Sequence, residues 1–175
     1  MKVDLSEFLE KEDQTVEKEV TIDLNSVTVS GGDHPRTDNE TISLTFYNSE
    51  GKNLYISGKT ELTFSAQCDR CLEDVDVSVP VEISADIGIS DDTFSMDNDE
   101  GLDYIEDGYL DVDGMIMAEV HLGWPSKILC KDDCLGLCPV CGKNRNLESC
   151  DCDTEVRDPR MMQFLDVFNE SKKEV

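Results

Sequence analysis

Residues 130–152, CKDDCLGLCPVCGKNRNLESCDC, contain six of the eight cysteines in this chain of 175 residues. The other two, Cys68 and Cys71, form a separate C-x2-C pair. Cysteines that are two to four residues apart can place their sulfurs around one metal ion, and four thiolates complete a tetrahedral zinc site. The eight cysteines therefore predict two zinc sites of four cysteines each.

Two partitions of the cysteines fit the spacing. The favoured one combines the zinc-knuckle pattern C-P-V-C-G with the cysteines that follow it, giving Cys138, Cys141, Cys150 and Cys152. The other site then contains Cys68, Cys71, Cys130 and Cys134. The competing partition groups Cys130, Cys134, Cys138 and Cys141 and leaves Cys150 and Cys152 to join Cys68 and Cys71.

The beginning of the chain, MKVDLSEFLEKEDQ, has neither the apolar run nor the small-residue cleavage pattern of a signal peptide, and no apolar stretch in the sequence is long enough to cross a membrane. We therefore expect a cytoplasmic protein without membrane contact. In a reducing compartment, closely spaced cysteines bind metal more often than they form disulfides. Their spacing favours zinc over an iron–sulfur cluster.

The charge is strongly negative. Fifteen Lys and Arg against forty Asp and Glu give a net charge of −25. Residues 1–123 hold seven basic and thirty acidic side chains, whereas residues 124–175 hold eight and ten. Such a surface repels phosphate backbones and attracts basic proteins. A basic protein partner is therefore expected, although adaptation to a salty cytoplasm would also explain the acidity.

Residues 91–113 contain ten carboxylates and no Lys or Arg. The spacing of these acidic residues does not fit an EF-hand, in which Gly follows acidic or amide residues at positions 1, 3 and 5. We expect a solvated acidic loop here, because charge runs of one sign repel themselves. The alternative is a segment that attracts a basic partner.

Period-two alternation predicts two long strands, at residues 54–66 and 75–89, with the C-x2-C pair at the tip of their hairpin. From Val16 to Val29 the alternation predicts a strand followed by a second strand or by a bulged continuation of the first. A further strand is expected at residues 42–46, after a polar connection at residues 31–40 that includes His34. Pro80 cannot donate a ladder hydrogen bond, which places it at a sheet edge or a bulge. Residues 4–12 fit either a short helix or an extended lead-in.

Helical periodicity begins after Asp111, a suitable N-cap, and predicts a helix over residues 111–122. A second amphipathic helix is expected after Asp158-Pro159. The predicted fold class is α+β, with a mainly antiparallel sheet or small open barrel from residues 16–89. We expect a β-rich core domain at 1–125 and a cysteine-rich module at 126–175 whose C-terminal helix packs on the core.

The sequence contains no recognisable catalytic arrangement. A catalytic zinc site keeps an open position and commonly uses His or carboxylate ligands, whereas both predicted sites contain four thiolates. Neither His34 nor His121 has a nucleophile at a recognisable spacing. We therefore expect a protein that is not an enzyme and has no small-molecule substrate. The basic residues beside the cysteines, above all Lys143 and Arg145, either compensate the thiolate charge or contact ribosomal RNA.

Several of these motifs together resemble the YceD family, the large ribosomal RNA subunit accumulation proteins of bacteria and plastids. The resemblance rests on C-D-R-C-L at residues 68–72, Trp124-Pro125, C-L-G-L-C-P-V-C-G at residues 134–142, Asn144, Asn146, Cys150, Cys152 and D-P-R at residues 158–160. It supports grouping Cys68 and Cys71 with Cys130 and Cys134, since some relatives lack the second knuckle.

The resemblance implies a role in accumulation of the large ribosomal RNA and biogenesis of the large ribosomal subunit. Combined with the charge, it predicts a non-enzymatic zinc-binding accessory factor whose acidic surface holds a basic ribosomal protein or a large-subunit assembly intermediate. The alternatives are a zinc protein that binds ribosomal RNA directly and a metal-dependent RNA-processing enzyme.

Overall fold

The chain divides into two compact units. The computed structural model describes residues 1–9, 11–29, 31–90, 93–96 and 104–153. The first unit, here called the sheet unit, comprises Met1–Cys68 and Asp74–Ile128; the second, the cysteine unit, comprises Asp69–Glu73 and Leu129–Val175. The helix expected after Asp158 lies outside the described residues, and its packing on the core stays a prediction. In the part of the chain that is described, no helix has the length and apolarity of a membrane span.

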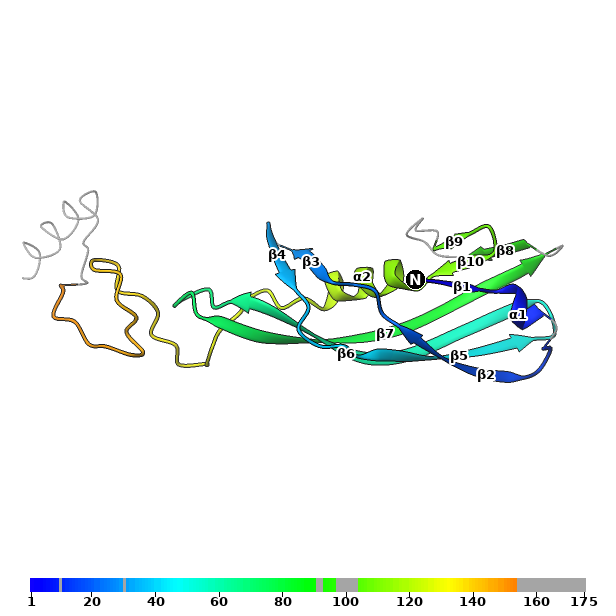
Figure 1. Cartoon of the computed structure of the whole chain (residues 1–175), viewed down its shortest axis with the longest axis horizontal. Helices are drawn as coiled ribbons and strands as arrows, with labels where there is room; N and C mark the ends of the chain where they lie inside the picture. Colours follow the sequence, from blue (N-terminus) through cyan, green and yellow to red (C-terminus); the bar gives the residue numbers. More distant parts are fainter. Residues whose placement is uncertain (10, 30, 91–92, 97–103, 154–175) are drawn as a thin grey trace, which may run out of the picture. The chain divides into compact units, whose positions relative to one another are not determined.

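A five-stranded antiparallel sheet forms the body of the sheet unit (Figure 1). Its strands, in spatial order, are β2 (Thr15–Thr21), β5 (Thr41–Ser49), β6 (Asn53–Gln67), β7 (Asp74–Ser90) and β8 (Thr93–Met96). The order begins at β2 and ends at β8, so among the described strands the sheet is open and does not close into a barrel. The prediction of a mainly antiparallel α+β fold is confirmed.

The alternation predicted for the two long strands is confirmed in β6 and β7. Leu54 lies opposite Ile87, and Leu62 lies opposite Val79, and all four side chains are buried. The alternate residues of both strands point to the other, more exposed face, as expected for an antiparallel sheet that the described elements cover on one side. Pro80 pairs with Glu61 of β6, and β8 pairs only with Ile87–Ser90, so Pro80 occupies an edge position among the described strands.

The buried face is covered by shorter elements: β1 (Lys2–Asp4), α1 (Ser6–Leu9), β9 (Ile105–Glu106), β10 (Tyr109–Asp111) and α2 (Val112–Gly123). The Asp111 side chain accepts a hydrogen bond from the Gly114 N–H at the beginning of α2, which confirms the predicted N-cap. Val112, Ile116 and Val120 of α2 are fully buried, and α2 packs against β7.

The prediction of a loop over residues 91–113 is wrong for its described part, which contains β8, β9 and β10. The reason is pairing over a long sequence distance, since Val3 of β1 lies opposite Leu110 of β10, and both side chains are buried. The acidic residues of this hairpin remain on its outer side, where Asp107 is exposed. The many carboxylates therefore do not prevent strand formation.

The connection predicted at residues 31–40 is also partly wrong. Gly32–Pro35 forms β4, which pairs with β3 (Ser26–Val29) after a turn in which Gly31 has a φ of +81°. After β4 the chain is held by Arg36, which donates hydrogen bonds to the backbone oxygens of Ile22 and Glu40. At the beginning of the chain, a short helix and an extended segment are the two predicted alternatives. Both occur, because the strand β1 is followed by the short helix α1.

Candidate metal centres

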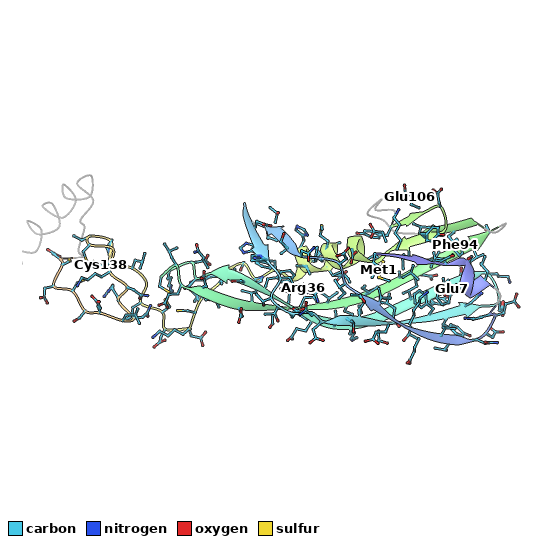
Figure 2. All side chains as sticks on the ribbon, in the orientation of Figure 1. Met1, Glu7, Arg36, Phe94, Glu106 and Cys138 are labelled. Atoms are coloured by element: carbon cyan, nitrogen blue, oxygen red, sulfur yellow. The ribbon has the colours of Figure 1, made fainter. Side chains whose placement is uncertain are left out.

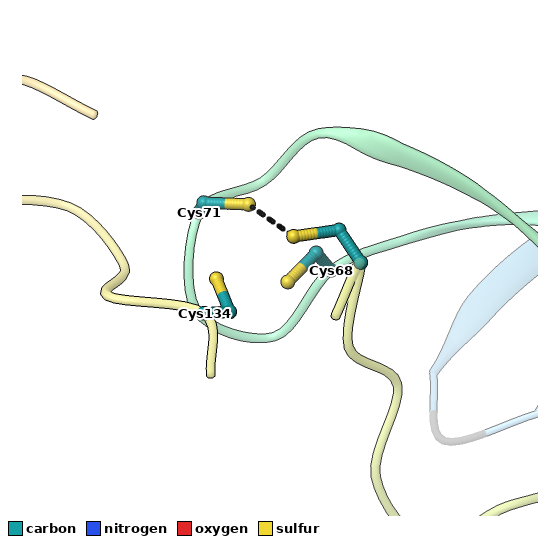
Figure 3. A group of neighbouring side chains, drawn as sticks. Cys68, Cys71 and Cys134 are labelled. Carbon is teal, nitrogen blue, oxygen red and sulfur yellow. Dashed lines mark hydrogen bonds between the residues drawn. The ribbon is translucent and has the colours of Figure 1, made fainter. Parts of the chain in front are cut away.

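The first group of cysteines consists of Cys68, Cys71, Cys130 and Cys134 (Figure 3). All four sulfurs lie within 4.8 Å of one another, and the Sγ atoms of Cys71 and Cys130 are 3.5 Å apart. Cys68, Cys71 and Cys134 are buried. Leu72, which follows Cys71, lies in the left-handed region with a φ of +61°, and the Cys71 sulfur points toward the other sulfurs (Figure 3).

Arg70 attaches the hairpin tip Asp69–Glu73 to the segment after Leu129. Its guanidinium donates to the backbone oxygen of Cys134 at 2.8 Å, and its own backbone oxygen accepts the N–H of Leu137 at 3.0 Å. Gly136, with a φ of +70°, lies so close that a Cβ there would come within 2.9 Å of the Arg70 oxygen. Only glycine fits both the conformation and the contact, which accounts for the L-G-L sequence before the knuckle.

The second group consists of Cys138, Cys141, Cys150 and Cys152, whose sulfurs also lie within 4.8 Å of one another. The knuckle turn is closed by hydrogen bonds from the Gly142 N–H to the Cys138 oxygen and from the Cys138 N–H to the Lys143 oxygen. The eight sulfurs thus group as in the favoured partition, and Cys138 and Cys141 do not join Cys130 and Cys134.

Backbone N–H groups shift the pKa of a cysteine in the second group. Those of Cys141 and Val140 lower the pKa of the Cys138 thiol to about 6, because they stabilise its thiolate. The pKa of Cys152 is raised to about 12, mainly because its thiol donates to Cys141. A metal-free group of this kind holds both thiolates and thiols, so binding of a divalent ion is coupled to release of the remaining protons.

Both groups fit zinc by their donor set. A Zn–S bond of about 2.3 Å places tetrahedrally arranged sulfurs about 3.8 Å apart, which is within the observed spread. Neither group includes a histidine or a carboxylate, so four thiolates would fill the coordination sphere. Such closed sites are typical of structural zinc.

A protein-family model described as "Large ribosomal RNA subunit accumulation protein YceD" matches residues 56–167. The chain belongs to the YceD family. No curated protein and no solved structure matches it. The matched span contains all eight cysteines, whereas β1 to β5 of this YceD-family chain precede it. The family match therefore coincides with both candidate metal centres.

Asn146 of this YceD-family chain supports the first group, a role that the sequence analysis missed. Its side-chain Nδ2 donates to the Cys134 sulfur at 3.3 Å, while its Oδ1 accepts the Leu135 N–H at 2.9 Å. Burial opposes ionisation of Cys134, but the hydrogen bonds from Asn146 and the Gly136 N–H outweigh burial and lower the pKa of this thiol. The sequence feature that could have indicated this role is the N-x-N pattern after the knuckle. Its two asparagines are linked, because Asn144 Oδ1 accepts the Asn146 N–H.

We expect Asn146→Asp to weaken zinc binding at the first group about tenfold, the lower end of the effect of residues that support metal ligands. The variant keeps the acceptor for Leu135 but replaces the donor to sulfur with a carboxylate oxygen. Competition with a chromogenic chelator measures the change. Asn39→Asp, which adds the same charge at an exposed site of the sheet unit, is the control; equal weakening in both variants would mean that charge alone is responsible.

Two of the basic residues near the cysteines in this YceD-family chain lie beside carboxylates. Lys143 pairs with Glu148 at 3.0 Å, and Lys131 lies 3.9 Å from Asp133. The described part of the cysteine unit, residues 69–73 and 129–153, carries four basic and seven acidic side chains. This composition favours local charge compensation over a basic surface for RNA.

Both histidines lie outside the cysteine groups, as expected. His34 packs its ring against Trp124, with 4.7 Å between ring centroids, and belongs to β4 rather than to a loop. The ring nitrogens of His121 lie 2.7 and 3.2 Å from the backbone oxygens of Met117 and Thr28. Ring packing therefore accounts for the position of His34, and backbone hydrogen bonds account for that of His121.

Proposed function

We propose that this YceD-family chain is a non-enzymatic, zinc-binding accessory factor that acts in the cytoplasm in accumulation of the large ribosomal RNA and biogenesis of the large ribosomal subunit. The observation that carries the proposal is the pair of closed four-cysteine groups within the span matched by the family model. Closed thiolate sites support structure rather than chemistry on a substrate, and this favours an accessory role over an enzyme.

In this proposal, Cys68, Cys71, Cys130 and Cys134 hold one zinc ion, and Cys138, Cys141, Cys150 and Cys152 hold the other. The bound ions supply the cross-links that fix the turns of the cysteine unit. Four thiolates around a divalent ion carry a charge of about −2, which adds to the acidity of the molecule. This agrees with the hydrogen-bond donors, Asn146 and backbone N–H groups, that point at the sulfurs.

The partner in this proposal is a basic ribosomal protein or an assembly intermediate that exposes one. The face of the central sheet that the described elements leave exposed supports this, because acidic side chains outnumber basic ones on it among the described residues. The acidic residues are Glu17, Glu19, Glu61, Asp74, Asp76, Glu82 and Asp86. The basic residue on this face is Lys59, and it pairs with Glu82 at 2.6 Å. Such a surface steers basic proteins toward it and loses this effect as salt screens the charges.

The test is depletion of the protein from cells, followed by measurement of large relative to small ribosomal RNA. We expect the ratio to fall and to recover with the wild-type chain but not with Cys138→Ser/Cys141→Ser. The protein should also co-migrate with large-subunit precursors on a sucrose gradient at low salt and leave them at high salt. An unchanged RNA ratio after depletion would exclude the proposed function.

Assays with the purified protein test the two alternative functions, direct RNA binding and RNA processing. Direct RNA binding through the cysteine unit requires that Lys143→Ala/Arg145→Ala abolish retention of ribosomal RNA by the purified protein on a filter. A processing enzyme requires metal-dependent cleavage of precursor RNA by the purified protein. Neither result is expected, because Lys143 is paired with Glu148 and neither cysteine group leaves a position for substrate.

A further inference from the structure

A cavity of about 640 Å³ lies in the sheet unit beside α1. Its lining combines the apolar residues Leu9, Phe94 and Ile105 and the aromatic Tyr109 with Asp4, Ser6, Asp107 and Gly108. Phe94 and Glu106 mark this end of the unit in Figure 2. A volume of several hundred Å³ with an apolar lining and a few polar groups is typical of a ligand site.

The backbone fixes the walls of this cavity. Asp4 of β1 lies opposite Tyr109 of β10, and the Leu5 N–H donates to the Gly108 oxygen at 3.0 Å. The β9–β10 turn is formed by Asp107 and Gly108, with φ values of +53° and +79°. The backbone positions of Asp4 and Asp107 are therefore fixed by a strand pair and a tight turn.

The lining is acidic and contains no basic side chain among the described residues. Asp4 Oδ1 accepts hydrogen bonds from the Ser6 N–H and hydroxyl, which lower the pKa of Asp4 and keep it ionised. Asp107 is exposed and has no hydrogen-bond or ion-pair partner among the described residues. Lys2 pairs through its ammonium with Glu106 and also interacts electrostatically with Asp107. Lys18, which pairs with Glu7, interacts in the same way with Asp4, so the two carboxylates are only partly compensated by neighbouring cations that lie outside the lining.

We infer that this cavity binds an arginine or lysine side chain of the basic partner, together with an apolar neighbour of that residue. The cation lies between Asp4 and Asp107 and over the ring of Tyr109, while the apolar neighbour packs on Phe94 and Ile105. Carboxylates and aromatic faces both attract such cations. The inference deepens the proposed function and rests on its basic partner, because it identifies where a single side chain of that partner inserts.

The test uses the full zinc-loaded chain, labelled with ¹⁵N, and the peptide acetyl-Leu-Arg-Leu-amide. We expect saturating shifts of the Gly108 and Tyr109 amide signals, and none from the same peptide with citrulline in place of arginine. Asp107→Asn should weaken binding about tenfold, as expected for loss of a charged hydrogen bond. Because asparagine tolerates positive φ, this variant keeps the turn.

The matched control is Asp13→Asn, which removes one charge at a residue with nearly the same φ, +54°, and does not line the cavity. We expect its affinity for the peptide to be unchanged. Equal binding of the arginine and citrulline peptides, shifts that do not saturate, or equal weakening by Asp13→Asn would each overturn the inference.

Failure of this inference is distinguishable from failure of the proposed function. If the peptide does not bind while depletion still lowers the large ribosomal RNA, the cavity assignment is wrong and the proposed function stands. If the peptide binds as expected while depletion leaves the RNA ratio unchanged, the cavity is a cation site and the proposed function is wrong.

Discussion

Removal of zinc with a chelator is expected to unfold the cysteine unit and to leave the sheet unit folded. The described residues of the cysteine unit contribute no side chain to the hydrophobic core. Several of their large apolar side chains face solvent instead; Leu135 is 57% exposed and Leu147 is 74% exposed. Without a core, the unit depends on its metal, and structural zinc contributes about 10 kcal/mol or more to folding.

Amide spectra measure this prediction. After chelation, the signals of residues 131–152 should collapse to the narrow range of an unfolded chain, whereas those of residues 42–66 should keep their dispersion. Addition of zinc should restore the lost signals. A dispersed spectrum for residues 131–152 in the metal-free protein would show that the unit folds without zinc.

Single substitutions serve as the control, because they address the groups one at a time. Cys68→Ser should halve the bound zinc while the signals around Cys141 and Gly142 stay dispersed, and Cys141→Ser should halve it by removing the other ion. A Cys68→Ser variant that retains both ions would contradict the assignment of this residue to the first group.

The second large effect is expected in the core of the sheet unit. Phe46→Ala should lower the free energy of unfolding by about 3–5 kcal/mol, as for other buried phenylalanines. Phe46 is 1% exposed, and its ring stacks on that of Phe8 in α1, with 4.1 Å between centroids and 8° between planes. The substitution therefore removes buried area from β5 and also the surface on which α1 packs.

Urea unfolding of the sheet unit measures this effect. Tyr47→Ala is the matched control, since Tyr47 follows directly in sequence, lies on the opposite face of β5 and is 38% exposed. It should cost about 1 kcal/mol or less, because it loses only a cross-strand contact with Tyr55. Similar losses in both variants would mean that the two faces of the sheet are equally important for stability.

Features with a local cause could be predicted from the sequence. The faces of β6 and β7 follow from alternation over fifteen or more residues, and the beginning of α2 follows from the capping chemistry of Asp111. The presence of two four-cysteine groups follows from the number and the close spacing of the cysteines, but spacing leaves two partitions open. The contact that brings Cys68 and Cys71 to Cys130 and Cys134 joins segments that are far apart in sequence.

Features that depend on distant partners could not be predicted. Strands β9 and β10 contain two and three residues, too few for a recognisable period, and they form because β10 pairs with β1 on one side and with β9 on the other. The donor role of Asn146 and the cavity beside α1 likewise arise from contacts between segments that are separate in sequence.

The edge position of Pro80 has a consequence for the behaviour of the protein at high concentration. A long strand with a partner on one side only is a template on which a strand of another molecule can add, which is how many β-rich proteins aggregate. Along β7 the proline removes one N–H from the strand, and the exposed carboxylates of Asp76 and Glu82 would meet like charges on a second copy. These residues oppose the addition of a second copy along the edge that β7 leaves unpaired among the described strands.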